Sequence, residues 1–192
     1  SSSNLIEYNF DTAQSMDIPS DWNSKDESLF FYEGTVWFKR DFDTRKKAGM
    51  KYVLYFGAVN YDAKVYVNGR KVGEHEGGYT PFNFDVTKYL IDGHNFVVVK
   101  VDNKRHPEGV LTVNMDWWNY GGITRDVLLA EVPEIYIEDY QIHLAKDMSG
   151  YISGWVKLDT TLSLQNIEFE IPELQLKEFL RTDSSGKATF HL

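Results

Sequence analysis

Apolar residues recur at every second position along most of this chain, and that pattern restricts the fold more than any other feature. Ala63, Val65 and Val67 alternate with polar or amphipathic neighbours, and Asn68-Gly69 follows them. A period of two is typical of a half-buried β-strand, because successive side chains point to opposite faces. Asn-Gly tolerates the positive φ angles of a type I′ turn, so the pattern predicts a β-hairpin.

Similar patterns predict further strands at residues 35–42, 52–56, 95–101 and 123–130. The segment 52–56 is apolar on both faces and is typical of a central strand. No stretch keeps a helical period over three turns, although one helical turn is expected at 87–91. Short strands separated by turns of this kind indicate an all-β sandwich or barrel.

The pattern changes near Pro133, where residues 131–134 predict a short break. Apolar residues then switch parity: Ile135 and Ile137 share one face, and Tyr140, Ile142 and Leu144 share the other. Either a β-bulge or a strand that leaves one core for another would cause this shift, and we favour the second. We expect new strands at 150–158, 166–171 and 187–192, with helix or strand left open at 173–180.

Residues 135–192 are fewer than the roughly 100 that a complete immunoglobulin-like sandwich needs. We therefore expect the chain to stop within a second domain and to expose strand edges. Such edges favour a homo-oligomer, in the form of edge-paired or exchanged strands.

Charge and composition argue against several classes of partner. The 29 acidic and 20 basic residues give a net charge of −9, which disfavours nucleic acid and anionic membranes. No apolar run approaches the roughly 20 residues that span a bilayer. Without cysteine, thiolate metal sites and disulfides are excluded. The compartment stays open, with a periplasmic or extracellular location favoured over a cytoplasmic one.

Familiar catalytic patterns are missing from the sequence. There is no Gly-rich phosphate loop before Lys-Ser or Lys-Thr, no serine elbow, and no pair of histidines at metal-ligand spacing. Glu74 and Glu76 share one strand face and could act as acid and base. A solvated charged pair is the more common meaning of such a pattern.

The segment from Asn114 to Gly122 is the most informative, because it places two tryptophans, a tyrosine, amides and a carboxylate in one loop. Aromatic rings stack on the apolar faces of sugars, and carboxylates accept hydrogen bonds from their hydroxyl groups. Alternatively, Trp117 and Trp118 close the end of the sandwich while Asp116 caps a turn. The residues alone leave these two interpretations open.

Several segments together resemble glycoside hydrolase family 2. The matching stretches are Gly34–Phe42, Val65–Gly69, Val72–Phe82, Asp85–Thr87, Asp102-Asn103 and Gly121–Val127. They occur in the family's order and spacing over roughly residues 5–144. The resemblance implies a jelly-roll (galactose-binding-like) sandwich domain at residues 1–134. It also implies the N-terminal part of an immunoglobulin-like sandwich at 135–192.

The resemblance further implies a parent enzyme that hydrolyses β-O-glycosidic bonds with retention, of the β-galactosidase or β-glucuronidase type. The family's catalytic glutamates lie in a downstream (β/α)-barrel, so this chain would be a non-catalytic, sugar-binding region without a cofactor or metal. Its partner would be a carbohydrate, a β-glycoside.

By position, Asp116 matches the family's aspartate that reaches the barrel's substrate. Trp117, Asn119 and Tyr120 would complete that substrate-binding loop, more as its support than as direct ligands. The glucuronidase-like branch has alanine where Gly121 stands. Two alternatives to this function are a stand-alone carbohydrate-binding module and a structural or dimerisation module without a ligand.

Overall fold

The computed structural model describes residues 10–110, 112–145, 150–160, 162 and 164–192. The chain divides into two compact units, Ser1–Glu131 and Val132–Leu192. Strands dominate both units, so the predicted all-β sandwich class is confirmed.

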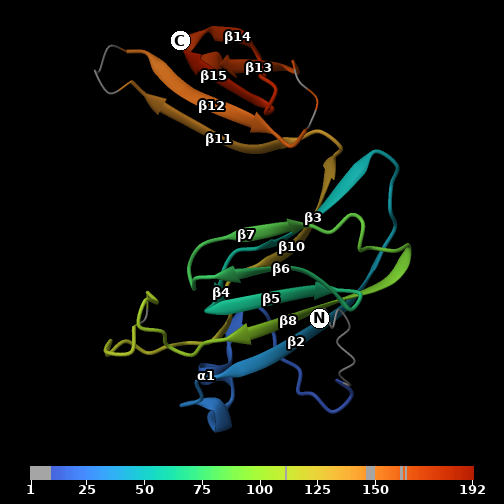
Figure 1. Ribbon diagram of the computed structural model, residues 1–192, viewed down its shortest axis with the longest axis vertical. Helices are drawn as coiled ribbons and strands as arrows, with labels where there is room; N and C mark the ends of the chain where they lie inside the picture. The colour runs from blue at the N-terminus through green and yellow to red at the C-terminus, as the bar shows by residue number, and fades with distance from the viewer. Residues whose placement is uncertain (1–9, 111, 146–149, 161, 163) are drawn as a thin grey trace. The chain divides into compact units, whose positions relative to one another are not determined.

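The larger sheet of the first unit has four strands in the order β2-β8-β5-β6 (Figure 1). They are β2 (Thr35–Thr44), β8 (Gly93–Asp102), β5 (Asp62–Val67) and β6 (Arg70–Glu76). Asn68 and Gly69 connect β5 to β6 with φ angles of 49° and 77°. Two positive φ angles are what a type I′ turn requires, so the predicted hairpin is confirmed.

The facing sheet has three strands in the order β10-β3-β7. They are β10 (Val127–Pro133), β3 (Met50–Phe56) and β7 (Phe82–Asp85). The middle place of β3 confirms the predicted central strand. The core takes alternate residues from three strands: Tyr52, Leu54, Phe56, Ala63, Val65, Val67, Val97, Val99 and Val101. Burial of this apolar surface is the main force that holds the two sheets together.

The single strand predicted at 123–130 is wrong, because the chain changes sheets there. Residues Gly122–Ile123 form β9, which lies between β1 (Ser20–Asp21) and β4 (Val59–Asn60) in a third, short sheet. The turn at 124–126 hydrogen-bonds to the 57–58 segment: Thr124 N donates to Ala58 O, and Asp126 O accepts from Gly57 N. Residues 124–126 are polar, so the apolar alternation also stops between Ile123 and Val127.

The expected break at 131–134 also begins later, because β10 runs to Pro133. Proline lacks an N–H and is tolerated where a strand ends, so Pro133 closes β10 instead of preventing it.

The second unit pairs β11 (Ile137–Leu144), β12 (Ile152–Leu158) and β15 (Lys187–His191) in that order. A hairpin of β13 (Asn166–Ile171) and β14 (Leu176–Arg181) forms a second sheet, joined by the 3-10 turn η2 (Pro172–Leu174). The segment left open at 173–180 is therefore mostly strand. Ile152, Val156, Phe169 and Phe190 form this unit's buried core.

Both causes considered for the change of parity after Pro133 are present: the chain leaves the first unit's core for that of the second, as we favoured, and β11 contains a β-bulge. Ile137 pairs with Leu158, but Asp139 pairs with Lys157, so Glu138 is the extra residue. The bulge turns the later apolar side chains of β11 toward the face that carries the β12 core residues.

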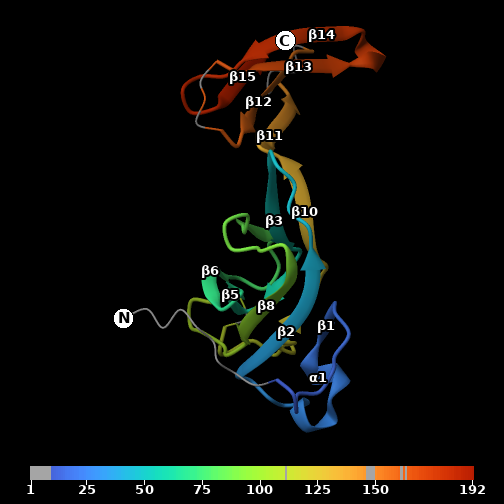
Figure 2. The same cartoon turned by 90° about the vertical axis from the view of Figure 1, so that its right-hand side faces the viewer.

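An N-terminal segment lies beside the start of the first unit's sandwich (Figure 2). It contains α1 (Trp22–Lys25) and η1 (Glu27–Leu29), which the side chains of Asp21 and Asp26 cap. Trp22 is fully buried and stacks on Phe38 of β2. These short elements have no helical period, so the sequence pattern did not predict them.

Buried asparagines connect this segment to the loop before β9. Asn23, 2% exposed, donates to the carbonyls of Leu29, Phe30 and Tyr32 at 2.9, 3.2 and 3.0 Å. Its Oδ1 accepts from Gly121 N at 2.9 Å. One amide therefore holds the turn of η1 and the end of the loop together.

Asn103, at the end of β8, makes a similar connection. It is fully buried; its Oδ1 accepts from Gly34 N at 2.8 Å and its Nδ2 donates to Asn119 O at 2.9 Å. The Asn119 amide in turn donates to Asn103 O and accepts from Asn60 Nδ2. Because a buried polar group is costly without a partner, the four amides are strong mutual constraints.

We expect Asn103→Ala to lower the free energy of unfolding by about 1–3 kcal/mol for each buried backbone group that it orphans. Urea titration followed by tryptophan emission would measure this loss, because four of the five tryptophans lie in the first unit. Asn83→Ala, at an exposed position of β7, is the matched control. Equal stability of the two variants would contradict the structural role of the amide network.

Candidate functional site

The loop between β8 and β9 carries the carboxylate that the sequence pointed to. Asp116 is exposed, and Trp117 and Trp118 keep 66% and 39% of their surface in contact with solvent. The described part of this loop, residues 103–110 and 112–121, has no regular secondary structure. The two tryptophans therefore do not close the end of the sandwich as core residues would.

The half-buried guanidinium of Arg105 holds this irregular loop. Arg105 Nη1 donates to Met115 O at 2.6 Å, and its Nη2 donates to Trp117 O at 2.8 Å. Its Nε donates to the Glu33 carboxylate at 2.9 Å. The loop backbone is thus fixed at both sides of Asp116, while the Asp116 side chain remains free to meet solvent or a ligand.

The β8 strand that leads into this loop is anchored at its last residue. Burial of the Asp102 carboxyl opposes its ionisation, but hydrogen bonds from the Thr35 hydroxyl and the Lys104 N–H outweigh this effect, and nearby lysines add to them. The pKa of Asp102 consequently lies below its ordinary value. A charged Asp102 ties β8 to β2 where the loop begins.

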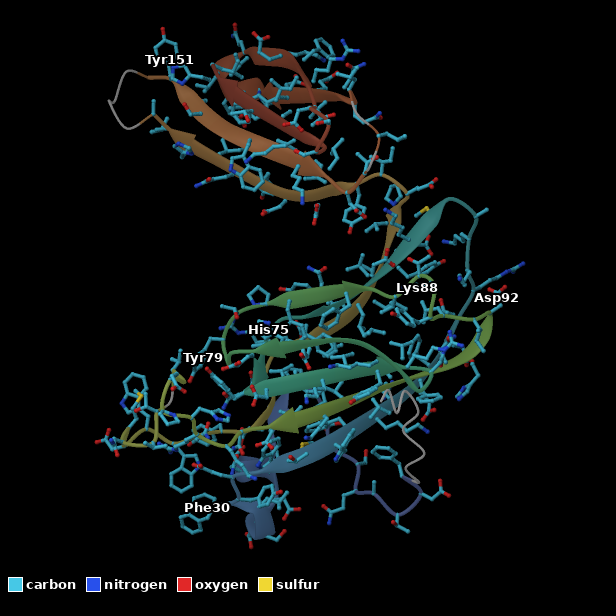
Figure 3. The ribbon with its side chains drawn as sticks, in the orientation of Figure 1. Phe30, His75, Tyr79, Lys88, Asp92 and Tyr151 are labelled. Atoms are coloured by element: carbon cyan, nitrogen blue, oxygen red, sulfur yellow. The ribbon has the colours of Figure 1, made fainter. Side chains whose placement is uncertain are left out.

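Aromatic side chains from two distant segments meet beside the loop. Phe30 and Phe31 contact Trp118 with ring centroids 4.8 and 5.5 Å apart, and Tyr120 lies 6.3 Å from Trp118. Phe31 is 82% exposed. Figure 3 shows Phe30 and Tyr79 at this end of the first unit, and Lys88 and Asp92 at the opposite end. We call Phe30, Phe31, Trp118 and Tyr120 the aromatic cluster.

A shallow pocket adjoins the aromatic cluster. Its volume is about 170 Å³, and its lining comprises Asn23, Phe30, Phe31, Glu33, Arg105, Trp118 and Asn119. Complete small-molecule sites usually measure about 300–1,000 Å³. The pocket therefore has the size of part of a site, with an apolar wall and a few polar groups.

The four residues predicted for the loop divide into two kinds. Asp116, Trp117 and Tyr120 expose their side chains, whereas Asn119 is 5% exposed and has its amide engaged with Asn60 and Asn103. Asn119 is thus placed as a support of the loop. Sequence reasoning missed Arg105 and Phe30, because neither stands in a recognisable motif and only the fold brings them to the loop.

Gly121 has a steric reason to lack a side chain. A methyl group there would meet the Trp22 ring and the Asn103 amide. The absence of a side chain at Gly121 thus leaves room for the buried indole of Trp22.

Glu74 and Glu76 are both exposed to solvent on β6. Glu74 is 60% exposed and forms an ion pair with Lys71 at 2.6 Å. The hydrogen bond and charge of Lys71 lower the pKa of Glu74. A general acid needs a raised pKa, so this environment does not suit acid catalysis. His75, between the two, stacks on Phe82.

The described residues contain neither a metal-ligand group nor a membrane-spanning helix. None of their His, Asp and Glu side chains gather in a group of three that could hold a metal ion. No helix in this part of the chain has the length and apolarity needed to cross a membrane.

Known proteins are similar to this chain in sequence. Residues 3–133 match the family model described as "Glycosyl hydrolases family 2, sugar binding domain". A beta-galactosidase of Thermoanaerobacter pseudethanolicus is 43% identical over 144 residues, which cover 71% of this chain and 19% of that protein. A beta-glucuronidase of Felis catus is 32% identical over 156 residues, 66% of this chain and 24% of the relative.

A solved structure has the same fold. The Bifidobacterium dentium beta-glucuronidase, complexed with coumarin-3-O-glucuronide, superposes with a TM-score of 0.76 at 24% identity. The match covers 92% of this chain and 36% of that one. The chain thus spans about a fifth to a quarter of the two curated relatives. It belongs to glycoside hydrolase family 2, and residues 3–133 form the sugar-binding domain of that family.

Proposed function

We propose that this chain is the non-catalytic N-terminal region of a retaining β-glycosidase and that its Asp116 loop completes the substrate pocket of a downstream barrel. The observation that carries the proposal is the exposed carboxylate of Asp116 on a loop whose backbone is held at Met115 and Trp117. The substrate class is a β-galactoside or β-glucuronide, the two activities named among the relatives above.

Carboxylate chemistry supports this role. An ionised aspartate only accepts hydrogen bonds, so it can accept them from the hydroxyl groups of a sugar. A loop on a rigid sandwich is a common carrier of binding residues. The pocket beside it is too small for a complete site, which agrees with a wall that a second domain would complete.

We propose that catalysis takes place in the downstream barrel and not in this chain. Retaining glycosidases need two carboxyl groups about 5 Å apart that flank the scissile bond. The exposed pair Glu74 and Glu76 is a poor candidate, because Lys71 lowers the pKa of Glu74 and so disfavours it as the general acid. The downstream barrel would hold both catalytic glutamates.

We further propose the domain limits 1–134 for the jelly-roll domain and 135–192 for the start of an immunoglobulin-like domain. The division of the chain at Glu131 and Val132 supports limits near these. So does the end of the family match at residue 133.

The aromatic cluster favours a second candidate function, in which the chain binds sugars without a barrel. Four exposed rings in mutual contact form an apolar surface beside polar pocket residues. Such a surface suits the apolar faces of sugar rings. A carbohydrate-binding module would need no further wall.

Asp116→Ala in the longer protein should lower kcat/KM about 10- to 150-fold, because a hydrogen bond to a charged group contributes about 1.5–3 kcal/mol. Hydrolysis of chromogenic β-galactosides and β-glucuronides would measure the loss. Asp43→Ala, a carboxylate 83% exposed near the far end of β2, should leave the kinetics unchanged. Wild-type kinetics in the Asp116 variant would refute the proposed pocket role.

The 192-residue chain alone should bind aryl β-glycosides weakly or not at all, because it supplies one wall of the pocket. Titration followed by tryptophan emission would test this. Saturable binding at micromolar ligand that Trp118→Ala abolishes would instead support the second candidate.

The chain alone should also form a dimer through β11, which lies at the edge of its sheet. Its apolar residues Tyr140, Ile142 and Leu144 are 64%, 45% and 73% exposed. We expect sedimentation to show a dimer and Ile142→Lys to shift it to monomer, because charge on an edge strand opposes pairing. A wild-type monomer would count against this assembly.

A further inference from the structure

We propose that Arg105, oriented by Glu33, is the positioning residue that fixes the direction of Asp116 in the substrate pocket. This inference rests on the proposed function and adds two residues to it that belong to no recognised motif of the loop. Neither residue touches substrate in this role, since both act through the backbone that carries Asp116.

The Nη1, Nη2 and Nε atoms of Arg105 each donate to a different acceptor. Nη1 and Nη2 donate to the carbonyls of Met115 and Trp117 at 2.6 and 2.8 Å. Nε donates to Glu33 Oε1 at 2.9 Å. The Arg105 side chain is 19% exposed and that of Glu33 is 38% exposed, so the guanidinium is largely covered while its bond to Glu33 lies at the surface. Charge-assisted bonds of this kind are among the stronger ones in proteins.

The two carbonyls restrict the backbone at Asp116. The Met115 carbonyl belongs to the peptide plane before Asp116, and the Trp117 carbonyl belongs to the plane after Trp117. Only the peptide between Asp116 and Trp117 lacks a bond to the guanidinium. Because peptide units are planar, two fixed planes leave few conformations for the residues between them. The direction of the Asp116 Cβ follows from that geometry.

Glu33 determines where the guanidinium lies. It immediately precedes Gly34, whose N–H donates to the buried Asn103 Oδ1 at 2.8 Å. Its carboxylate is therefore carried by a backbone segment that is already anchored to the core. The ion pair orients the planar fork and balances its charge. Lysine could not replace arginine, because a single ammonium cannot present two parallel donors from a rigid plane.

Positioning of this kind has a measurable kinetic consequence. A misplacement of about 1 Å can lower the rate of an enzyme about 100-fold. Arg105→Ala in the longer protein should therefore lower kcat/KM about 10- to 100-fold, within the range expected for Asp116→Ala. Arg105→Lys should recover little of the loss. The double variant should be no slower than Asp116→Ala alone, because both changes remove one shared function.

A second measurement follows the loop itself in the 192-residue chain. Arg105→Ala should speed amide hydrogen exchange at residues 114–118 at least tenfold while leaving exchange in β5 and β8 unchanged. Arg70→Ala, an exposed arginine next to the β5–β6 turn, is the matched control and should change neither kinetics nor exchange.

The outcomes separate the two proposals. If Asp116→Ala impairs hydrolysis but Arg105→Ala does not, the positioning role is refuted and the pocket role stands. Additive losses in the double variant, or unchanged exchange at 114–118, would also overturn the positioning role. If Asp116→Ala is fully active, the pocket role fails first, whatever Arg105 does to the loop.

Discussion

Hydrogen bonds from buried amide side chains and a half-buried guanidinium hold the loop that carries Asp116, and the geometry of the site depends on them. Asn23 and Asn103 connect the segment before β2 to the loop, and Arg105 does so through its ion pair with Glu33. The loop has no ladder of its own, so its backbone groups need these partners. An irregular segment thereby acquires the rigidity of the sandwich behind it.

This arrangement separates two tasks among residues of similar type. Asn119 is polar and lies within the same loop as Asp116, yet its amide is engaged by Asn60 and Asn103. Asp116, three positions earlier, leaves its carboxylate exposed. Burial distinguishes the two, because a buried amide must find partners inside the protein whereas an exposed carboxylate can still take them from a ligand.

Sequence periodicity succeeded where strands are long and one face is buried, as in β2, β5 and β8. It failed at residues 123–130, where the polar residues 124–126 separate β9 from β10 and mark the change of sheet. It could not separate the two causes of the parity change after Pro133, since a bulge in β11 and a change of core give the same pattern and both are present. Alternation records which face is apolar and does not record which strand is the partner.

The sequence by itself determined the all-β class, the Asn68-Gly69 hairpin and, through family motifs in order, the loop with Asp116. These depend on local preferences, in which each residue's own chemistry decides the outcome. Only the tertiary structure decided that Phe30 and Phe31 meet Trp118, and that Glu33 and Arg105 hold the Asp116 backbone. Those contacts join residues about 70 to 90 positions apart. Pairing of β2 with β8, which sets Thr35 opposite Asp102, brings the segments before β2 and after β8 together, and no pattern within one segment specifies it.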